Sequence, residues 1–388
     1  MDRSNTIRVG HIPALTWNSL KMNEGRVPEF LSLNTGTDIR FQSLPRGITH
    51  KKMTMKQAAD WLLKNAPGQE AERFVAGKVP IYHPQTFGTG LGAEFEAFMN
   101  EACGRCDLLE VEKGMKAEEP LSWHIDFFDG TRGAGAQIIH LCENASLTLV
   151  LDYASAREAA GLAALSTRIV LDQGAKLTFV TAQTLGRGFL HLSDIGASQA
   201  DGSHLEIVEL DLGGKDSFTG IQVEQIGRSA ALKGHMGYMA VQDQSVDINY
   251  NVIQRGRKTS SLFDFDGVLS DQGKKSFRGT IDFRNGACGA VGNEQEGVLL
   301  MSPDVVNKTL PIILCEEEDV EGAHGATIGR LSEDMLFYMT SRGIDEKTAE
   351  RIIVRARLDA VAAKVPVTAL REKLTAFIEE TFSDEQSD

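Results

Sequence analysis

Residues 143–150 read ENASLTLV and residues 173–180 read QGAKLTFV, so one pattern occurs twice at an offset of 30 positions. A weaker third copy, GSHLEIV at residues 202–208, follows at an offset of 28. Each copy pairs a polar turn with alternating apolar side chains, as in a half-buried strand. Repetition at this period is typical of stacked supersecondary units that cover one another.

The repeat extends upstream and belongs to a longer run of strand-like sequence. Ile139 and Leu141 recur as Ile169 and Leu171 at the same offset. Farther along, residues 246–252 alternate apolar and polar side chains, which is typical of a strand with two different faces. From about residue 107 onward the chain therefore consists of short β-type segments separated by turn residues.

Three β-containing architectures compete for this region. A doubly wound α/β sheet needs a crossover helix after each strand, and no convincing long helix follows the alanine-rich stretch near residues 156–165. A Greek-key β-sandwich remains an alternative, since short alternating strands suit both folds. The regular offset favours a mainly β fold, a parallel β-solenoid in which each coil lays its apolar row on the one below.

The flanking sequence has helical character and suggests three regions. We expect a mixed helical region over residues 1–106, the β core over 107–330 and a helical domain over 331–388. In the first region Thr54 can cap a helix, and residues 93–102 show helical spacing of apolar side chains.

Three C-terminal helices are expected from their caps and stop signals. Ser332 and Asp345 are suitable N-caps, Gly343 can end the first helix, and Pro366 precedes the third. The apolar face expected for the second helix comprises Ala349, Ile352, Ile353 and Ala356.

Composition and charge exclude several classes of partner. The formal net charge of −14, with no long run of lysine and arginine, argues against nucleic acid. No apolar run reaches the length of a membrane span, and the first residues lack the pattern of a signal peptide, so a cytoplasmic protein is expected. Five cysteines in 388 residues fit reduced thiols better than a disulfide framework.

Two glycine-rich segments resemble nucleotide-binding motifs and fail on spacing. The glycines of residues 88–92 do not match a dinucleotide fingerprint. Residues 267–275 have one residue too many for a phosphate loop, and Lys275 stands where a magnesium-binding hydroxyl belongs. We therefore expect no ATP hydrolysis by this chain.

The cysteines give only weak signals of metal binding. Cys103 and Cys106 form a solitary C-x-x-C pair, whereas a structural zinc site usually needs a second pair. Whether this pair binds metal stays open, with two ordinary thiols as the simpler interpretation. Cys142, Cys288 and Cys315 lie in strand-like sequence, where we expect small buried side chains.

His324 is the candidate metal ligand. Small residues flank it on both sides, which leaves its imidazole open, and neutral imidazole is a common ligand for iron and zinc. We expect it between the last strand and the first C-terminal helix. From chemistry alone, a surface or capping histidine is the favoured interpretation.

A C-terminal block of the sequence resembles the SufB/SufD family of iron–sulfur cluster assembly proteins. The segments that carry the resemblance are PIIL at 311–314, EDV at 318–320, HGATIG at 324–329, LFY at 336–338 and SRGI at 341–344. Looser similarity reaches upstream through residues 276–279 and 143–145 to residues 16–23, and so covers most of the chain.

The resemblance implies a fold and a function. Family members have a right-handed parallel β-helix flanked by N-terminal helices and a C-terminal helical domain. It implies a non-catalytic scaffold subunit of a SufBCD complex, which pairs with SufB through the β-helices and binds the ATPase SufC through its C-terminal helices. His324 would be a cluster or iron ligand at the SufB interface. No permanently bound cofactor is implied, only a transient cluster or iron shared with SufB.

Within the family, two departures favour the SufD type. SufB-like members carry a cysteine just before the strand that contains the proline, and residues 304–311 hold none. SufB-like members also tend to have an acid directly after the signature histidine, where this chain has Gly325. The cysteine that often precedes the histidine by two residues is Gly322 here, so a paired Cys–His ligand is not expected.

Two other functions stay as alternatives. A self-sufficient homodimeric scaffold that works with SufC alone would have the same fold, and a separate SufB gene beside this one would argue against it. A β-helix polysaccharide lyase or hydrolase would need an export signal and an aromatic or acidic cleft, and aromatic residues make up only 7% of the chain.

Overall fold

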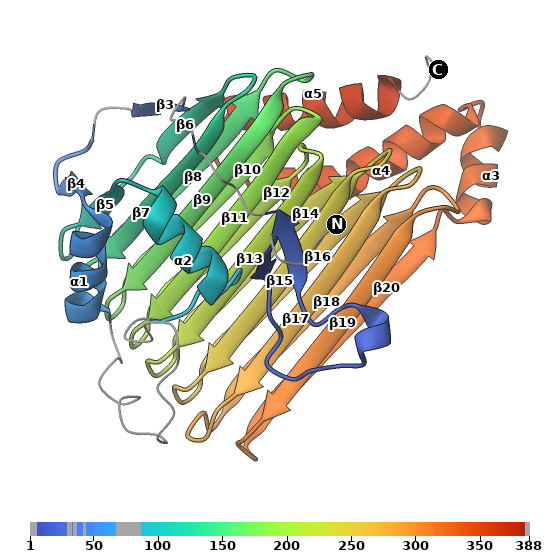
Figure 1. The fold of residues 1–388 in the computed structure, drawn as a ribbon. Coiled ribbons are helices and arrows are strands. Elements are labelled where there is room, and N and C mark those ends of the chain that lie inside the picture. Colours follow the sequence, from blue (N-terminus) through green and yellow to red (C-terminus); the bar gives the residue numbers. More distant parts are fainter. Residues whose placement is uncertain (1–5, 29–32, 34–36, 42–43, 67–86, 385–388) are drawn as a thin grey trace.

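The computed structural model describes residues 6–28, 33, 37–41, 44–66 and 87–384 (Figure 1). Two parallel sheets form its body, and each turn of the chain adds one strand to each sheet. The odd-numbered sheet contains β5 (Cys106–Val111), β7 (Arg132–Leu141), β9 (Ala160–Leu171), β11 (Gly188–Gln199), β13 (Asp216–Gln225), β15 (Ser245–Gln254), β17 (Lys274–Phe283) and β19 (Val306–Cys315). The even-numbered sheet contains β6 (Leu121–Phe127), β8 (Ser146–Ser155), β10 (Lys176–Thr184), β12 (His204–Asp211), β14 (Ala231–Ala240), β16 (Ser260–Leu269), β18 (Ala290–Leu300) and β20 (Val320–Arg330).

The sequence repeat appears directly in the strand register. Leu147 on β8 lies beside Leu177 on β10, and Leu177 lies beside Leu205 on β12. On the other sheet, Ile139 of β7 lies beside Ile169 of β9. Because repeated residues are hydrogen-bonded neighbours in adjacent turns, the expected parallel β-solenoid of about eight turns is confirmed.

The interior between the two sheets is the main hydrophobic core. Alternate residues along each strand point inward, and the buried ones form a continuous apolar cluster from the first turn to the seventh. Its aromatic centre stacks Tyr250, Phe263 and Phe265, with ring centroids 4.5–5.7 Å apart. At ~25 cal/mol per Å² of apolar area, this cluster is the main source of stability in the solenoid body.

The first turn is covered by antiparallel strands. β4 (Ile48–Met53) pairs with β5, and β3 (Thr37–Phe41) pairs with β6. Each therefore occupies the sheet edge that the first turn would otherwise expose. A separate hairpin of β1 (Thr6–Val9) and β2 (Gly25–Pro28) precedes these strands in the chain, and its Gly25 lies close to Phe218 of β13 and Asp247 of β15.

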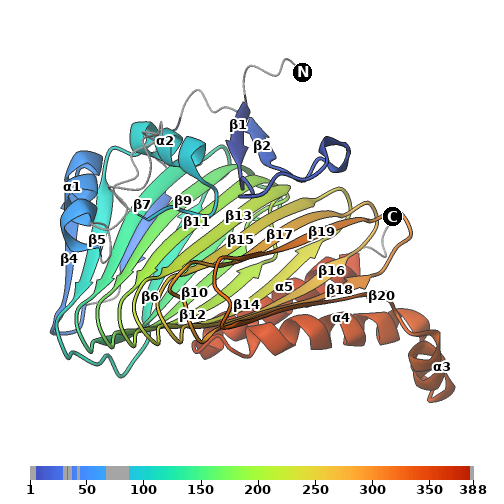
Figure 2. The ribbon, with the colours of Figure 1, turned by 90° about the horizontal axis from the view of Figure 1, so that it is seen from below.

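The N-terminal helices lie on the outer face of the odd-numbered sheet (Figure 2). α1 (Met55–Asn65) has Thr54 as its N-cap with a complete capping box, as expected, and buries Ala58 and Leu62. α2 (Ala93–Ala102) matches the expected bounds and buries Phe95 and Met99. A one-turn 3-10 helix, η1 (Asn18–Leu20), precedes β2.

The glycines of residues 88–92 allow close backbone packing beside α2. A Cβ on Gly90 would lie 1.9 Å from the backbone nitrogen of Ile221 on β13, so only glycine fits there. The Nδ2 of Asn249 donates to the Gly90 carbonyl at 2.8 Å. This segment is a loop before a helix, as the sequence predicted.

The C-terminal helices are α3 (Glu333–Ser341), α4 (Glu346–Ala362) and α5 (Thr368–Asp384). Ser332 and Asp345 are the N-caps, and Gly343 follows the end of α3 with a positive φ of 86°, as expected. α4 and α5 pack on the outer face of the even-numbered sheet, opposite the N-terminal helices (Figure 2).

Two local features depend on the sheets beneath them. The alanine-rich stretch near residues 156–165, for which no structure was predicted, lies largely in strand β9, where its small side chains pack against neighbouring strands. In α4 the expected apolar face is rotated: Ile352 and Ala356 are exposed, while Val354, Leu358 and Val361 face the sheet. The sheet supplies the larger apolar surface and therefore sets which face of α4 is buried.

No helix among the described residues is both long and apolar enough to cross a membrane.

Candidate functional site at the open end of the solenoid

The last turn, β19 and β20, leaves one end of the solenoid uncovered. Each strand is the edge of its sheet and has one hydrogen-bonded neighbour, β17 and β18 respectively. Every residue of both strands is partly or fully exposed, whereas the strands of the inner turns alternate with buried residues. An uncovered sheet edge is a ready template for pairing with another chain.

The side chains at this end include the inward-facing row of the solenoid. In a parallel in-register pair, opposite residues point to the same face. Ile313 lies beside the core residue Ile281, and Ile328 beside the core residue Val298. Ile313 and Ile328 are nevertheless 40% and 44% exposed, because no further turn covers them.

His324 belongs to this row. It lies within strand β20 rather than in the expected connection to the C-terminal helices, and it pairs with Glu294 on β18. The imidazole is exposed, and no hydrogen bond or ion pair joins it to any residue that the structure describes. Its flanking glycines and alanines therefore leave it open, as the sequence indicated.

A buried polar cluster lies one strand below His324. Lys275 and Glu296 form a fully buried ion pair, and Thr309 Oγ1 donates to Glu296 Oε2 at 2.8 Å. Tyr238 OH donates to the same carboxylate at 3.2 Å. Burial, followed by the charge of Glu296, raises the pKa of Glu294 to about 8. A buried carboxyl group with a raised pKa thus lies beneath the exposed imidazole.

The failed phosphate-loop motif is part of this cluster. Lys275 lies on strand β17 with its ammonium inside the solenoid, so it cannot reach a nucleotide phosphate. Burial lowers its pKa, and the charge of Glu296 opposes that effect. The lysine of this glycine–lysine pattern is therefore a member of a buried ion pair.

At the open end the described residues provide one exposed imidazole and no complete metal site. Groups of three metal-ligating side chains within 4.8 Å occur once in the described chain, and His324 is not a member. A metal needs about four donors in a closed site. His324 could therefore hold iron or a cluster only with donors from outside this last turn.

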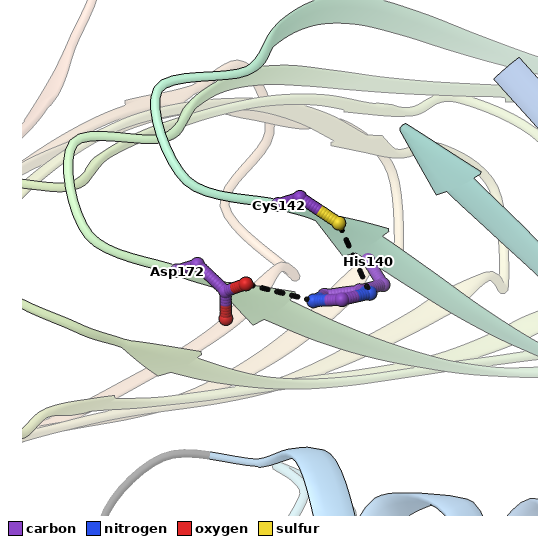
Figure 3. Close-up of side chains that lie close together, drawn as sticks. All are labelled: His140, Cys142 and Asp172. Carbon is purple, nitrogen blue, oxygen red and sulfur yellow. Dashed lines mark hydrogen bonds and ion pairs between the residues drawn. The ribbon is translucent and has the colours of Figure 1, made fainter. Parts of the chain in front are cut away.

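The three-residue group comprises His140, Cys142 and Asp172, which sequence reasoning missed (Figure 3). His140 is buried on β7, and the other two follow the ends of β7 and β9. Burial lowers the pKa of His140, but hydrogen bonds to Asp172 and Glu110 outweigh this and raise it. The sequence feature that could have revealed this group is a His-x-Cys pair followed by an acidic residue thirty positions after the cysteine. Thirty residues is also the offset of the repeat.

The cysteines do not lie where the sequence predicted. Cys142 and Cys288 are half-buried and Cys315 is exposed, because all three lie where the chain leaves one sheet for the other. Cys103 and Cys106 are the buried pair, and burial raises their pKa values to about 11 and about 12. This pair packs in the core beneath α1 and α2.

Comparison with known proteins gives one family match. The family model described as "SUF system FeS cluster assembly, SufBD core domain" matches residues 129–357, which is more than half of the chain. The matched region covers most of the solenoid, the open end and the first C-terminal helices.

Curated relatives carry related names. The chain is 28% identical over 137 residues to "Iron-sulfur cluster assembly protein SufD" of Bacillus subtilis, covering 35% of this chain and 31% of that protein. It is 26% identical to a SufBD family protein of Mycobacterium bovis, covering 51% and 24% respectively. A SufBD family protein of Staphylococcus saprophyticus is 22% identical over 71% of this chain and 59% of its own length. The chain thus spans less than two thirds of each of these relatives.

Proposed function

This chain belongs to the SufB/SufD core-domain family of the SUF system, and on that premise we propose that it is a non-catalytic scaffold subunit for iron–sulfur cluster assembly. Its partners in this proposal are a SufB-type subunit and the ATPase SufC, in the cytoplasm. It holds no permanent cofactor, and a cluster or iron ion is transient cargo.

The observation that carries the proposal is the uncovered last turn. Inward-facing apolar side chains, Ile313 and Ile328, are exposed beside two unpaired strand edges. A second β-solenoid placed end to end would bury this apolar row and hydrogen-bond the free edges. The SufB-type subunit is the occupant proposed for this end.

His324 would then lie in the interface between the two subunits. Among the described residues it belongs to no group of three potential metal ligands, as expected for a ligand of a shared site. The partner subunit would supply the thiolate and carboxylate donors that complete the coordination shell. Glu294 lies directly beneath His324 as a further carboxyl group from this chain.

Helix α3 is the part of the C-terminal region proposed to bind SufC. α3 buries no residue, and its exposed side chains include Met335 (50%), Phe337 (75%) and Tyr338 (59%). α4 and α5 use their apolar faces against the solenoid instead, so they are not a free helical block. Truncation after Leu331 would therefore uncover a second core, and point substitutions on α3 are the cleaner test.

The deciding experiment co-expresses the chain with SufB-type and SufC-type subunits and measures iron and acid-labile sulfide anaerobically. His324→Ala should leave complex formation and melting temperature unchanged, because the side chain is exposed, while iron and sulfide fall severalfold. His204→Ala is the matched control, because that imidazole is also exposed and its Nδ1 lies 3.0 Å from the Gly202 carbonyl oxygen.

Each result separates the alternatives. Unchanged iron per complex in His324→Ala removes this residue from the site. If Phe337→Ser with Tyr338→Ser still retains SufC, docking lies elsewhere. A complex that forms with SufC alone and loads iron without any SufB would favour the homodimeric scaffold.

A further inference from the structure

His140, Cys142 and Asp172 lie together near the covered end of the solenoid, far along the strand order from His324. His140 is on β7, the second strand of its sheet from the covered edge, counting parallel strands. Glu110 lies beside it in register on β5, and Asp172 follows β9 on the other side. The backbone register of three parallel strands therefore fixes this group.

The donor atoms are close to the spacing of a tetrahedral metal site. His140 Nε2 lies 3.2 Å from Asp172 Oδ2, and Cys142 Sγ lies 3.9 Å from His140 Nδ1. One donor atom from each residue lies within 4.8 Å of the other two. With bonds of about 2.0–2.3 Å, ligand atoms around zinc are about 3.5 Å apart, so each donor needs to move by less than about 1 Å.

The surroundings support a ligating histidine. Carboxylates flank the imidazole at both nitrogens, since Glu110 Oε2 lies 3.2 Å from Nδ1. With Nε2 as the ligating nitrogen beside Asp172, Nδ1 keeps Glu110 as its partner, the usual outer-shell support for a metal-bound histidine. Trp61 of α1 packs edge-on against the ring at 5.0 Å between centroids and limits its rotation.

Charge and access also suit a cation. Burial, followed by the charges of Asp172, Glu110 and Glu112, raises the pKa of the Cys142 thiol, and Lys51 pairs with Glu110 at 3.7 Å on the outer side of the group. His140 is 7% exposed, while Cys142 and Asp172 are half-buried, so an ion can enter from the solvent side. Nitrogen, sulfur and oxygen donors together select borderline divalent ions such as Zn²⁺ and Fe²⁺ rather than Mg²⁺ or Ca²⁺.

We propose that His140, Cys142 and Asp172 form a binding site for a divalent transition-metal ion of the zinc and ferrous iron class, with Glu110 as the supporting carboxylate. The metal replaces the proton on the Cys142 sulfur and the proton on the ligating nitrogen of His140, and both protons leave to solvent. All three protein ligands come from this chain, a water molecule would take the fourth position, and the site is independent of the assembly function proposed above. It therefore binds metal in the isolated protein, without any partner.

Anaerobic titration of the reduced, chelator-treated full chain with Co²⁺ tests the site. One equivalent should bind with micromolar or tighter affinity and give a near-ultraviolet thiolate-to-cobalt absorption band, which Zn²⁺ then removes. Cys142→Ser should abolish the band and weaken binding by at least about 100-fold. Asp172→Asn and Glu110→Gln should weaken binding by about 10–100-fold, as lost carboxylates do.

Cys288→Ser is the matched control. Cys288 is also a half-buried thiol, and it donates to Asp319 Oδ2 at 2.8 Å, yet it belongs to no three-ligand group in the described chain. This variant should keep the full band and affinity. Absence of the band in the parent chain, persistence of the band in Cys142→Ser, or saturation only at millimolar Co²⁺ would each overturn the proposal.

Circular dichroism and thermal melting of every variant accompany the titration. Cys142 is partly exposed, so Cys142→Ser changes one atom and leaves the fold intact. A folded Cys142→Ser protein that retains tight cobalt binding therefore counts against the site without ambiguity.

Discussion

The two ends of the solenoid differ in how their outermost turns are covered. At the first turn, β3 and β4 pair antiparallel with β6 and β5, and α1 packs beside them. Alternate residues of β6 are consequently buried. At the last turn no described strand pairs with the outer edges of β19 and β20, η1 reaches β19 through Lys308 and Leu20, and the inward row is exposed.

The two ends therefore differ in the kind of metal site that each could form. At the covered end, strands and a helix fix His140 among several donors, so a site can be complete within the chain. At the open end, His324 belongs to no group of three potential ligands among the described residues. A repetitive fold can thus be self-sufficient at one end and dependent on a partner at the other.

The largest expected effect comes from matched truncations at the two ends. Leu109 on β5 is fully buried in the core, so Leu109→Ala should lower the free energy of unfolding by ~2–5 kcal/mol. Ile313→Ala, an inward-facing residue of the last turn, should cost less than ~1 kcal/mol, because its side chain is already 40% exposed. Urea unfolding of the isolated chain measures both.

Equal losses in the two variants would contradict an uncovered end. They would mean that Ile313 is buried in solution, for instance by a second copy of the chain. Sedimentation at several protein concentrations checks that explanation.

A second, smaller effect concerns buried and exposed carboxyl groups. Burial, with the nearby charge of Asp211, raises the pKa of Glu209 in the solenoid interior to about 8. Between the ordinary value of ~4.3 and 8, the unfolded chain has released this proton while the folded chain keeps it, so stability falls as pH rises. Glu209→Gln should therefore gain stability relative to the parent from pH 5 to pH 8, by an amount on the order of a few kcal/mol.

Glu321→Gln on β20 is the control for that titration, because Glu321 is exposed at the open end. Its stability difference from the parent should stay constant across the same pH range. A pH-independent effect of Glu209→Gln would show that Glu209 is ionised in the folded protein.

The smallest expected effect compares two helix caps. Thr54 caps α1, which buries Ala58 and Leu62, so Thr54→Ala should cost ~1 kcal/mol in global unfolding. Ser332 caps α3, which buries nothing, so Ser332→Ala should leave global unfolding unchanged and only increase local fraying. Hydrogen exchange of the α3 amides would detect the fraying; a global loss equal to that of Thr54→Ala would mean that α3 is packed.

The sequence predicted the repetitive and local features well, for physical reasons. In-register stacking places equivalent residues of successive turns side by side. The offset between Leu147 and Leu177 therefore predicted which residues pair on neighbouring strands. Caps such as Thr54, Ser332 and Asp345 depend on neighbours a few residues away, and all three were identified. Such features need no knowledge of the rest of the fold.

Features that depend on contacts between segments far apart in the sequence were missed. The buried face of α4 depends on the sheet beneath it, which no helical period reveals. His324 was placed in a loop, because its glycine and alanine neighbours suggest a turn when the strand pairing is unknown. The His140 group joins residues thirty positions apart, and only the exact register of β7 and β9 makes them neighbours.

The in-register stacking also fixes distances along the solenoid axis. Each turn advances one strand spacing of ~4.8 Å, and six such steps separate β7 from β19, so the His140 group lies roughly 30 Å from the open end. Each turn contacts mainly its two neighbours, so one whole coil could be deleted or duplicated without altering the pairing at either end. Such a change would alter the distance between the His140 group and the open end by one strand spacing. Evolution or protein engineering can therefore change this distance only in whole turns.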